Sequence, residues 1–297
     1  MTSTPPLAGI VPYVPTPINA SHVDAASVRR LVEHLLAEGV TGISPLGSTG
    51  EVMYLTPEQR LEMVQAVVAA VAGRVPVVVG VAAFSSEDVT AQIRRYEDAG
   101  ADAFVVILQR YFPLTADEQY AFFASAAQAT DAPIVVYSNP LLGADITADL
   151  AVRLSGIDNI RYLKDASGNT GRLYSVIGRV GSAMSVFAAS AHVPALVFQI
   201  GGVGWMSGPA CVAPRASVAL YDSWKAGDLD RMWRIQRALW PLNELFGRYS
   251  AAAFIKFALN AQGFDVGEPC PPKGPLPPSV GERFSEVMRG IDEALAS

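Results

Sequence analysis

Short apolar runs alternate with helical hydrophobic patterns along the first 225 residues. Between residues 24 and 37, the apolar side chains at 28, 31, 32, 35 and 36 recur at the spacing of an amphipathic helix. Runs rich in valine, isoleucine and alanine lie between such helical patterns, and they are typical of buried strands. They predict eight strands, at residues 9–18, 39–47, 75–83, 101–108, 133–137, 160–164, 183–188 and 203–206.

A helical pattern follows each predicted strand. These patterns cover residues 24–37, a segment that begins at 56, and residues 86–99, 116–129, 147–154, 170–180, 194–200 and 211–225. Spacers of this length allow helical crossovers between parallel strands. Eight strand–helix units predict an α/β fold of the (β/α)₈ TIM-barrel class, which usually needs ~250 residues. An open doubly wound sheet is the alternative, but no Gly-x-Gly-x-x-Gly turn follows an early strand.

The end of the chain has a different pattern. Helical periods cover residues 229–246, 250–261 and 280–296, and a loop rich in glycine and proline covers residues 263–278. No strand pattern occurs there. We therefore predict two parts, a catalytic barrel at residues 1–226 and an all-helical C-terminal extension at residues 227–297.

Composition narrows the class of protein. The chain has 51% hydrophobic residues and a mean hydropathy of +0.28, enough for a large core. Its net charge of −6 argues against nucleic acid or an anionic membrane as the main partner. Two cysteines and three scattered histidines give no metal or disulfide pattern. The first residues show no signal-peptide pattern, so we expect the protein in the cytoplasm.

Lys164 is the main candidate for chemistry. It is one of four lysines and the only one that a predicted strand would deliver into the mouth of a barrel. Burial disfavours an ammonium group, so the free amine can exist near neutral pH and can attack a ketone to form a Schiff base. The alternative is that Lys164 ends its strand paired with Asp165.

Two other strand ends carry polar groups. After the second predicted strand, Ser48 and Thr49 offer hydroxyls in a glycine turn whose backbone N–H groups can also bind a carboxylate. Tyr137 ends the strand before that of Lys164 and can act as a general acid or base. The alternatives are an ordinary turn and a tyrosine that fills the barrel. Together, these groups are the parts that an enzyme acting on 2-oxo acids needs.

The chain resembles the N-acetylneuraminate lyase and dihydrodipicolinate synthase superfamily of Schiff-base class I aldolases. The resemblance runs over nearly the whole chain, including the helical tail. It rests on four motifs, namely Gly47-Ser48-Thr49-Gly50-Glu51, Tyr137-x-x-Pro140, Lys164-Asp165-x-Ser167-Gly168-Asn169 and Gly201-Gly202-x-Gly204.

The resemblance implies catalytic roles for four residues. Lys164 would form the Schiff base with pyruvate or another 2-oxo acid, and Tyr137 would move the proton while the carbon–carbon bond forms or breaks. Ser48 would link Tyr137 to a second tyrosine, Tyr111, which in this superfamily reaches in from the neighbouring subunit. A homo-oligomer, either a dimer or a tetramer of dimers, is therefore implied. No metal or organic cofactor is implied, because the iminium is itself the electron sink.

The resemblance also implies a substrate-binding set, in which two departures are informative. Gly47, Ser48 and Thr49 would bind the carboxylate of the 2-oxo acid. Dihydrodipicolinate synthases carry an arginine at the position of Leu142, and a leucine cannot pair with a second carboxylate.

Neuraminate lyases place acidic side chains after the seventh strand, where this chain has Ala189 and Ser190. We expect Leu142, Ala189, Ser190, Trp205 and Met206 to form a pocket for a smaller or less polar aldehyde.

The sequence thus predicts a lyase that joins or splits a 2-oxo acid and an aldehyde through an imine on Lys164. A 2-keto-3-deoxy sugar acid dehydratase of the same superfamily is one alternative. A true dihydrodipicolinate synthase is another, which Leu142 disfavours. A barrel that binds 2-oxo acids without turnover is a third, although such a protein needs no proton relay.

Overall fold

The computed structural model describes residues 6–141 and 143–297. Seven parallel strands form one curved sheet in the order β1, β9, β8, β7, β6, β5, β4. Their bounds are β1 Gly9–Pro12, β4 Val78–Ala83, β5 Ala103–Leu108, β6 Ile134–Ser138, β7 Ile160–Asp165, β8 Ser185–Ala188 and β9 Gly204–Ser207. Residues 43–44 join the two edges, because Ser44 bridges Tyr13 and Ile43 bridges Val77. The sheet therefore closes into a barrel.

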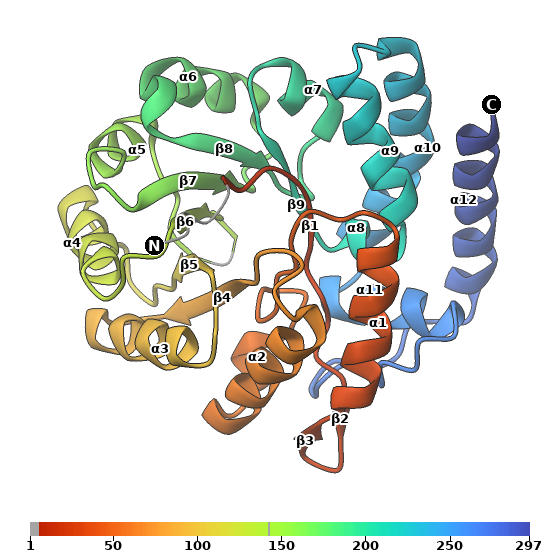
Figure 1. The fold of residues 1–297 in the computed structure, drawn as a ribbon, viewed down its shortest axis with the longest axis horizontal. Helices are drawn as coiled ribbons and strands as arrows, with labels where there is room; N and C mark the ends of the chain where they lie inside the picture. The colour runs from red at the N-terminus through yellow and green to blue at the C-terminus, as the bar shows by residue number, and fades with distance from the viewer. Residues whose placement is uncertain (1–5, 142) are drawn as a thin grey trace.

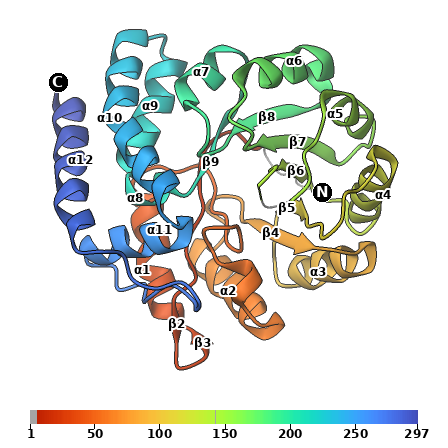
Figure 2. The same ribbon diagram turned by 180° about the vertical axis from the view of Figure 1, so that it is seen from behind.

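Helices surround the strands on the outside, as Figures 1 and 2 show. In chain order they are α1 Ala25–Ala37, α2 Pro57–Val71, α3 Ser86–Asp98, α4 Ala116–Ala127, α5 Ala148–Leu154, α6 Thr170–Val180, α7 Pro194–Gln199, α8 Pro209–Val212 and α9 Pro214–Lys225. Single 3₁₀ turns occur at η1 Val52–Tyr54 and η2 Gly181–Ala183. The predicted (β/α)₈ barrel with a C-terminal helical extension is confirmed.

Local capping residues explain where several helices begin. Thr56 and Thr115 form capping boxes with Gln59 and Glu118, at the starts of α2 and α4. Asn169 accepts the N–H of Arg172 at the start of α6. Each cap satisfies backbone donors that a helix leaves unpaired in its first turn.

Prolines account for the main differences from the predicted elements. The first strand ends at Pro12 instead of residue 18, and a short hairpin follows, made by β2 Ile18–Asn19 and β3 His22–Val23. The second predicted strand, 39–47, is reduced to isolated bridges before Pro45. The predicted helix 211–225 is divided into α8 and α9, because the backbone leaves the helical region at Ala213, directly before Pro214. Proline supplies no N–H and disfavours a helical residue before it.

Three helices follow the barrel. They are α10 Leu229–Arg248, α11 Ala251–Ala261 and α12 Ser279–Ala296, and α10 packs against both α9 and α12 on one side of the molecule (Figures 1 and 2). The division at residues 226 and 227 stays a prediction. None of the helices in residues 6–141 and 143–297 is long and apolar enough to cross a membrane.

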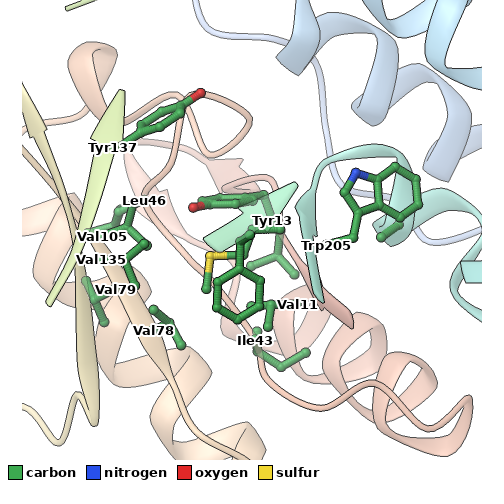
Figure 3. Close-up of a cluster of buried hydrophobic side chains, with 14 of the residues drawn as sticks. Val11, Tyr13, Ile43, Leu46, Val78, Val79, Val105, Val135, Tyr137 and Trp205 are labelled. Atoms are coloured by element: carbon green, nitrogen blue, oxygen red, sulfur yellow. The ribbon is translucent and has the colours of Figure 1, made fainter. Parts of the chain in front are cut away.

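Apolar side chains fill the barrel. Val11, Val79, Val105 and Val135 come from different strands and gather in one cluster (Figure 3). Tyr13 and Tyr137 lie at one end of this cluster (Figure 3). Tyr13 follows β1 and Tyr137 is the next-to-last residue of β6, so both lie at the carboxyl ends of strands, which is where barrels of this class hold their active sites.

Candidate active site

Lys164 lies in the wall of the barrel beside Tyr137. The two residues are paired in the register of the neighbouring parallel strands β6 and β7. The Nζ atom of Lys164 lies 4.0 Å from the centre of the Tyr13 ring and 4.0 Å from the centre of the Tyr137 ring. Lys164 is only 5% exposed, and burial lowers its pKa to about 7. A large fraction of the amine is therefore uncharged near neutral pH.

Asp165 does not pair with Lys164, so the alternative in which Lys164 ends its strand in an ion pair with Asp165 is wrong. Its Oδ1 atom accepts hydrogen bonds from the backbone N–H of Ser167, at 2.8 Å, and from the Ser167 hydroxyl. The same oxygen lies 3.2 Å from Nε2 of His192, and Oδ2 lies 3.9 Å from Nε of Arg172. Burial alone would raise the pKa of Asp165, but the hydrogen bonds from His192 and Ser167 and the charge of Arg172 lower it.

Because neighbouring residues of a strand point to opposite faces, Lys164 points into the barrel and Asp165 points toward the helices outside it. In the part of the chain that the structure describes, Lys164 makes no ion pair.

Tyr137 carries a protonated hydroxyl in a hydrogen-bonded position. Burial raises its pKa, hydrogen bonds with Asn139 and Ser48 oppose this, and the charge of Asp165 adds to the rise. The Asn139 Nδ2 atom donates to the Tyr137 hydroxyl at 2.9 Å. A hydroxyl held in this way, beside the amine, can give a proton to a reacting oxygen and take it back.

The turn that carries Ser48 and Thr49 has an unusual backbone at both ends. Leu46 and Glu51 have φ values of 61° and 57°, in the left-handed region that residues with a side chain rarely adopt. A Cβ added at Gly47 would lie 2.3 Å from Cδ1 of Tyr13, so this glycine makes room for the tyrosine ring. The turn that carries Ser48 and Thr49 can therefore pack against the Tyr13 ring only with glycine at position 47.

A cavity of about 410 Å³ opens above the amine of Lys164. Five of the predicted site residues line it, namely Ser48, Thr49, Tyr137, Lys164 and Ser190. The other lining residues are Tyr13, Asn139, Leu141, Ala166, Ala189, Ala191, Gly208, Asn243, Phe246, Gly247, Tyr249 and Ala251. The cavity thus brings together an amine, a phenol and the hydroxyls of three of these residues.

Among the described residues that were expected at the site, Gly47, Tyr111, Trp205 and Met206 do not line this cavity. Gly47 lies behind Tyr13, and Met206 is fully buried in the core, as is Trp205, which was also expected in the pocket. Tyr111 is 85% exposed and packs edge-on against Phe112, with ring centres 4.9 Å apart. Leu142 lies outside the described residues. Because Trp205 and Met206 in β9 are buried, a contact between these side chains and the substrate stays a prediction.

Two groups of lining residues were missed in the sequence. Tyr13 and Asn139 follow strand ends, so the same rule that selected Lys164 could have found them. Asn243, Phe246, Gly247 and Tyr249 belong to α10 and the turn after it. No pattern in the sequence places these residues over the barrel, because their position depends on how α10 packs against distant elements.

A buried carboxylate ties the turn of Ser48 and Thr49 to the C-terminal extension. Glu51 is 1% exposed, and its Oε2 atom lies 2.8 Å from Nζ of Lys256, which is equally buried in α11. Its Oε1 atom accepts the backbone N–H of Cys270 at 2.8 Å and lies 3.6 Å from Nζ of Lys273. Lys256 also donates to the carbonyl of Glu268. One side chain of the barrel therefore holds both α11 and the loop that follows it.

The described residues contain no cluster of three or more His, Cys, Asp or Glu side chains that could hold a metal ion. The chemistry that the site can perform with its own groups is that of a neutral amine beside a phenol. Such an amine attacks carbonyl carbons, and the phenol can carry the protons that this attack displaces.

A profile of the dihydrodipicolinate synthetase family matches residues 6–291. The chain belongs to this family. A protein of Methylibium petroleiphilum named 4-hydroxy-tetrahydrodipicolinate synthase is 33% identical over 286 residues, which cover 96% of this chain and 98% of that protein. The family consists of lyases, and its match over the barrel and the extension agrees with the predicted resemblance.

Solved structures of this family have the same fold. The dihydrodipicolinate synthase of Agrobacterium tumefaciens superposes with a TM-score of 0.88 and 29% identity, over 96% of this chain and 98% of that chain. A chloride-inhibited dihydrodipicolinate synthase of Acinetobacter baumannii, crystallised with pyruvate, gives a TM-score of 0.90 and 25% identity, over 96% of this chain and 98% of that chain.

The buried amine predicts a pH-dependent difference in stability. The pKa of Lys164 is about 7 in the folded protein, against an ordinary value of 10.5, so the unfolded chain binds more protons between these two pH values. Folding of the wild type at pH 7 therefore costs free energy, because the amine must lose a proton or be buried with its charge. The Lys164→Met variant has no amine at this position and avoids this cost. We expect it to be more stable than the wild type at pH 7, by on the order of 3 kcal/mol, and the gap to narrow toward pH 10. Urea unfolding at both pH values measures it.

The exposed lysine of α9, Lys225, provides the matched control. The Lys225→Met variant should show a small difference that does not change with pH. A Lys164→Met gap of the same size at pH 7 and pH 10 would contradict an uncharged Lys164.

The Glu51–Lys256 pair predicts a non-additive double mutant. The Glu51→Leu variant leaves the Lys256 ammonium buried without its carboxylate, which we expect to lower the free energy of unfolding by about 3–5 kcal/mol. The Glu51→Leu, Lys256→Met double variant removes both charges and should recover part of this loss. Chemical unfolding of the three proteins tests it, and a double variant less stable than Glu51→Leu would show that the pair is not the cause.

Proposed function

We propose that this protein is a Schiff-base lyase that joins or cleaves a 2-oxo acid, such as pyruvate, and an aldehyde. The single observation that carries the proposal is the neutral amine of Lys164 held between the Tyr13 and Tyr137 rings at the floor of a cavity. With a pKa of about 7, a large fraction of the amine is deprotonated near neutral pH and can attack a ketone. The pyruvate present in the crystal of the Acinetobacter baumannii relative supports this choice of 2-oxo acid.

The proposed first half-reaction makes an enamine. The Lys164 amine attacks the carbonyl carbon of pyruvate. The carbonyl oxygen leaves as water with one proton from the amine and one from the Tyr137 hydroxyl, so an iminium forms. Ser48 and Thr49 hold the carboxylate of pyruvate with their hydroxyl and backbone N–H groups. The Tyr137 phenolate then takes a proton from the methyl carbon, which gives the enamine because the iminium accepts the electron pair. No metal or organic cofactor takes part in this step.

The second half-reaction makes the carbon–carbon bond. The enamine carbon attacks the aldehyde carbon, and the aldehyde oxygen takes the hydroxyl proton of Tyr137. Water then adds to the iminium, which releases a 4-hydroxy-2-oxo acid and restores the amine. The same steps in reverse cleave that acid. Tyr137 recovers its proton from the water that adds to the iminium, and hydrogen bonds with Ser48 and Asn139 hold its oxygen in place.

A second candidate is 4-hydroxy-tetrahydrodipicolinate synthase itself, which the name of the Methylibium petroleiphilum relative favours. Against it stands the residue at the position of the family arginine, which is Leu142 here. The described lining residues supply no arginine in its place. Turnover of the carboxylate-bearing second substrate of that synthase, compared with uncharged aldehydes, separates the two candidates.

Exposed apolar side chains near the site support an interface with a second subunit. Large apolar side chains are exposed after successive strands at the same end of the barrel, namely Met53, Tyr54, Phe84, Tyr111 and Phe112. A second cavity, of about 260 Å³, lies beside the first, shares Ser48 and Ala251 with it, and includes Met53 and Tyr54 in its wall. Exposed apolar groups of this kind suit an interface between subunits. We propose a homo-oligomer in which Tyr111 reaches toward Ser48 of the neighbouring subunit.

The imine is tested by reduction in the presence of pyruvate. We expect borohydride to fix one pyruvate-sized adduct on the wild-type protein, and peptide mass mapping to find it on Lys164. The rate of adduct formation should rise with pH through about 7, because only the deprotonated amine reacts. Intact mass spectrometry measures both.

The variants give the controls for this experiment. Lys164→Met should gain no adduct, whereas Lys225→Met should gain the same adduct as the wild type. An adduct that persists in folded Lys164→Met, or a wild-type protein that gains none with pyruvate or longer 2-oxo acids, would exclude the proposed reaction.

The oligomer is tested through Tyr111. Light scattering should give a dimer or tetramer for the wild type. Tyr111→Phe keeps the aromatic ring and removes only the hydroxyl, so the assembly should persist. We expect kcat to fall by ~100-fold, because the proton relay loses one member. The pyruvate adduct on Lys164 should still form. A monomeric wild-type protein with full activity would contradict this arrangement.

A further inference from the structure

The proposed imine places a positive charge on a nitrogen that has no acidic side chain beside it. Lys164 is buried, and Asp165 is held on the other side of β7 by Ser167 and His192. No Asp or Glu occurs among the described residues that line the cavity, including its upper wall, to which α10 contributes Asn243, Phe246 and Gly247. A buried cation is unfavourable unless other groups stabilise it.

Two aromatic rings flank this nitrogen. The Nζ atom of Lys164 lies 4.0 Å from the centre of the Tyr13 ring and 4.0 Å from the centre of the Tyr137 ring. Tyr137 belongs to β6, the neighbour of β7, whereas β9 and β8 lie between β7 and β1, which Tyr13 follows. Both rings lie at the same end of the barrel filling (Figure 3). The face of an aromatic ring attracts a cation at such distances, most strongly away from water.

The two tyrosines differ in what their hydroxyls can do. Tyr137 gives up and regains its proton in each proposed half-reaction. For Tyr13, burial raises the pKa well above the ordinary value, and the nearby charge of Tyr137 adds to the rise, while Ser44 opposes it. Tyr13 therefore keeps its proton throughout the reaction. Its contribution must come from the ring.

The Tyr13 ring is fixed in place before any substrate binds. The backbone N–H of Tyr13 donates to the carbonyl of Ser207 at 3.1 Å. Gly47 lies directly against the ring, since a Cβ there would be 2.3 Å from Cδ1 of Tyr13. A stabilising group that is already positioned needs no rearrangement when the charge appears.

We propose that Tyr13 is a further catalytic residue, whose aromatic face stabilises the iminium on Lys164 through a cation–π contact. The proposal rests on the proposed lyase function and concerns its covalent intermediate. Because the deprotonated amine has no charge, it gains little from the same contact, and the ring favours the intermediate over the free enzyme. The iminium occurs in both half-reactions, so the ring acts in both.

The equilibrium between pyruvate and its iminium measures this contact. Rapid borohydride reduction at about pH 9 traps the iminium over a range of pyruvate concentrations, and intact mass spectrometry gives the concentration at half-saturation. Since the amine has a pKa of about 7, it is deprotonated at this pH, and the measurement reports on the iminium alone. Tyr13→Phe should stay within about twofold of the wild type. Tyr13→Leu should raise half-saturation by about 10–30-fold.

A fluorinated series separates the cation–π contact from packing. Phenylalanine analogues with one, two and three ring fluorines are incorporated at position 13. Each fluorine withdraws electron density from the face of the ring, so half-saturation should rise stepwise from Tyr13→Phe onward. A ring that only fills space and excludes water would give one value for all four proteins. The trifluorinated analogue at Phe123, which is buried in α4, is the matched control and should leave half-saturation unchanged.

The outcomes distinguish this proposal from the lyase reaction. A wild-type protein that gains no adduct with pyruvate or longer 2-oxo acids would reject the reaction and, with it, the role of Tyr13. A wild-type adduct with equal half-saturation for Tyr13→Phe and the folded trifluorinated protein would reject the role of Tyr13 alone.

Discussion

The burial of one amine, which lowers its pKa to about 7, is the constraint on which this site depends. Lys164 is enclosed by two aromatic rings and by the apolar filling of the barrel, and it has no carboxylate beside it. A carboxylate next to it would favour the charged ammonium form and raise its pKa again. The neighbouring Asp165 is instead held on the opposite side of the strand by Ser167 and His192.

Closure of the barrel makes that environment possible. The amine, the phenol of Tyr137 and the turn with Ser48 and Thr49 come from three different strand ends, and they meet only because the sheet curves back on itself. The fit is tight, since Gly47 lies directly against the Tyr13 ring and left-handed residues flank the turn. Strain of this kind persists only where the surrounding structure fixes it, and it often marks a functional site.

The sequence predicted the barrel because alternating strand and helix periods are local signals. It placed Lys164 beside Tyr137 because consecutive units of a barrel are neighbours. It was wrong about the length of the first two strands and about the helix before Pro214, where proline chemistry outweighed the hydrophobic pattern. It placed Met206 in the pocket, although the register of β9 buries that side chain.

It could not predict the upper wall. Asn243 and Phe246 reach the cavity through the packing of α10, and Lys256 finds Glu51 across some 200 positions of the chain. A single sequence gives no periodic pattern that predicts such contacts, because each contact depends on how a whole helix packs in the folded protein. The hydrophobic pattern of the sequence therefore predicts the cavity residues at the strand ends, but it does not predict those that α10 contributes.

The link from Glu51 to α11 means that the barrel and the C-terminal helices form one site together, although they are successive parts of the chain. A barrel transferred alone to another protein would carry Lys164, but it would lack the α10 residues that line the cavity and the Lys256 side chain that pairs with Glu51. Conversely, changes in α10 can alter which molecules are accepted while the reactive floor stays untouched. Divergence within such a scaffold can therefore proceed through its last helices, with the reaction chemistry inherited unchanged.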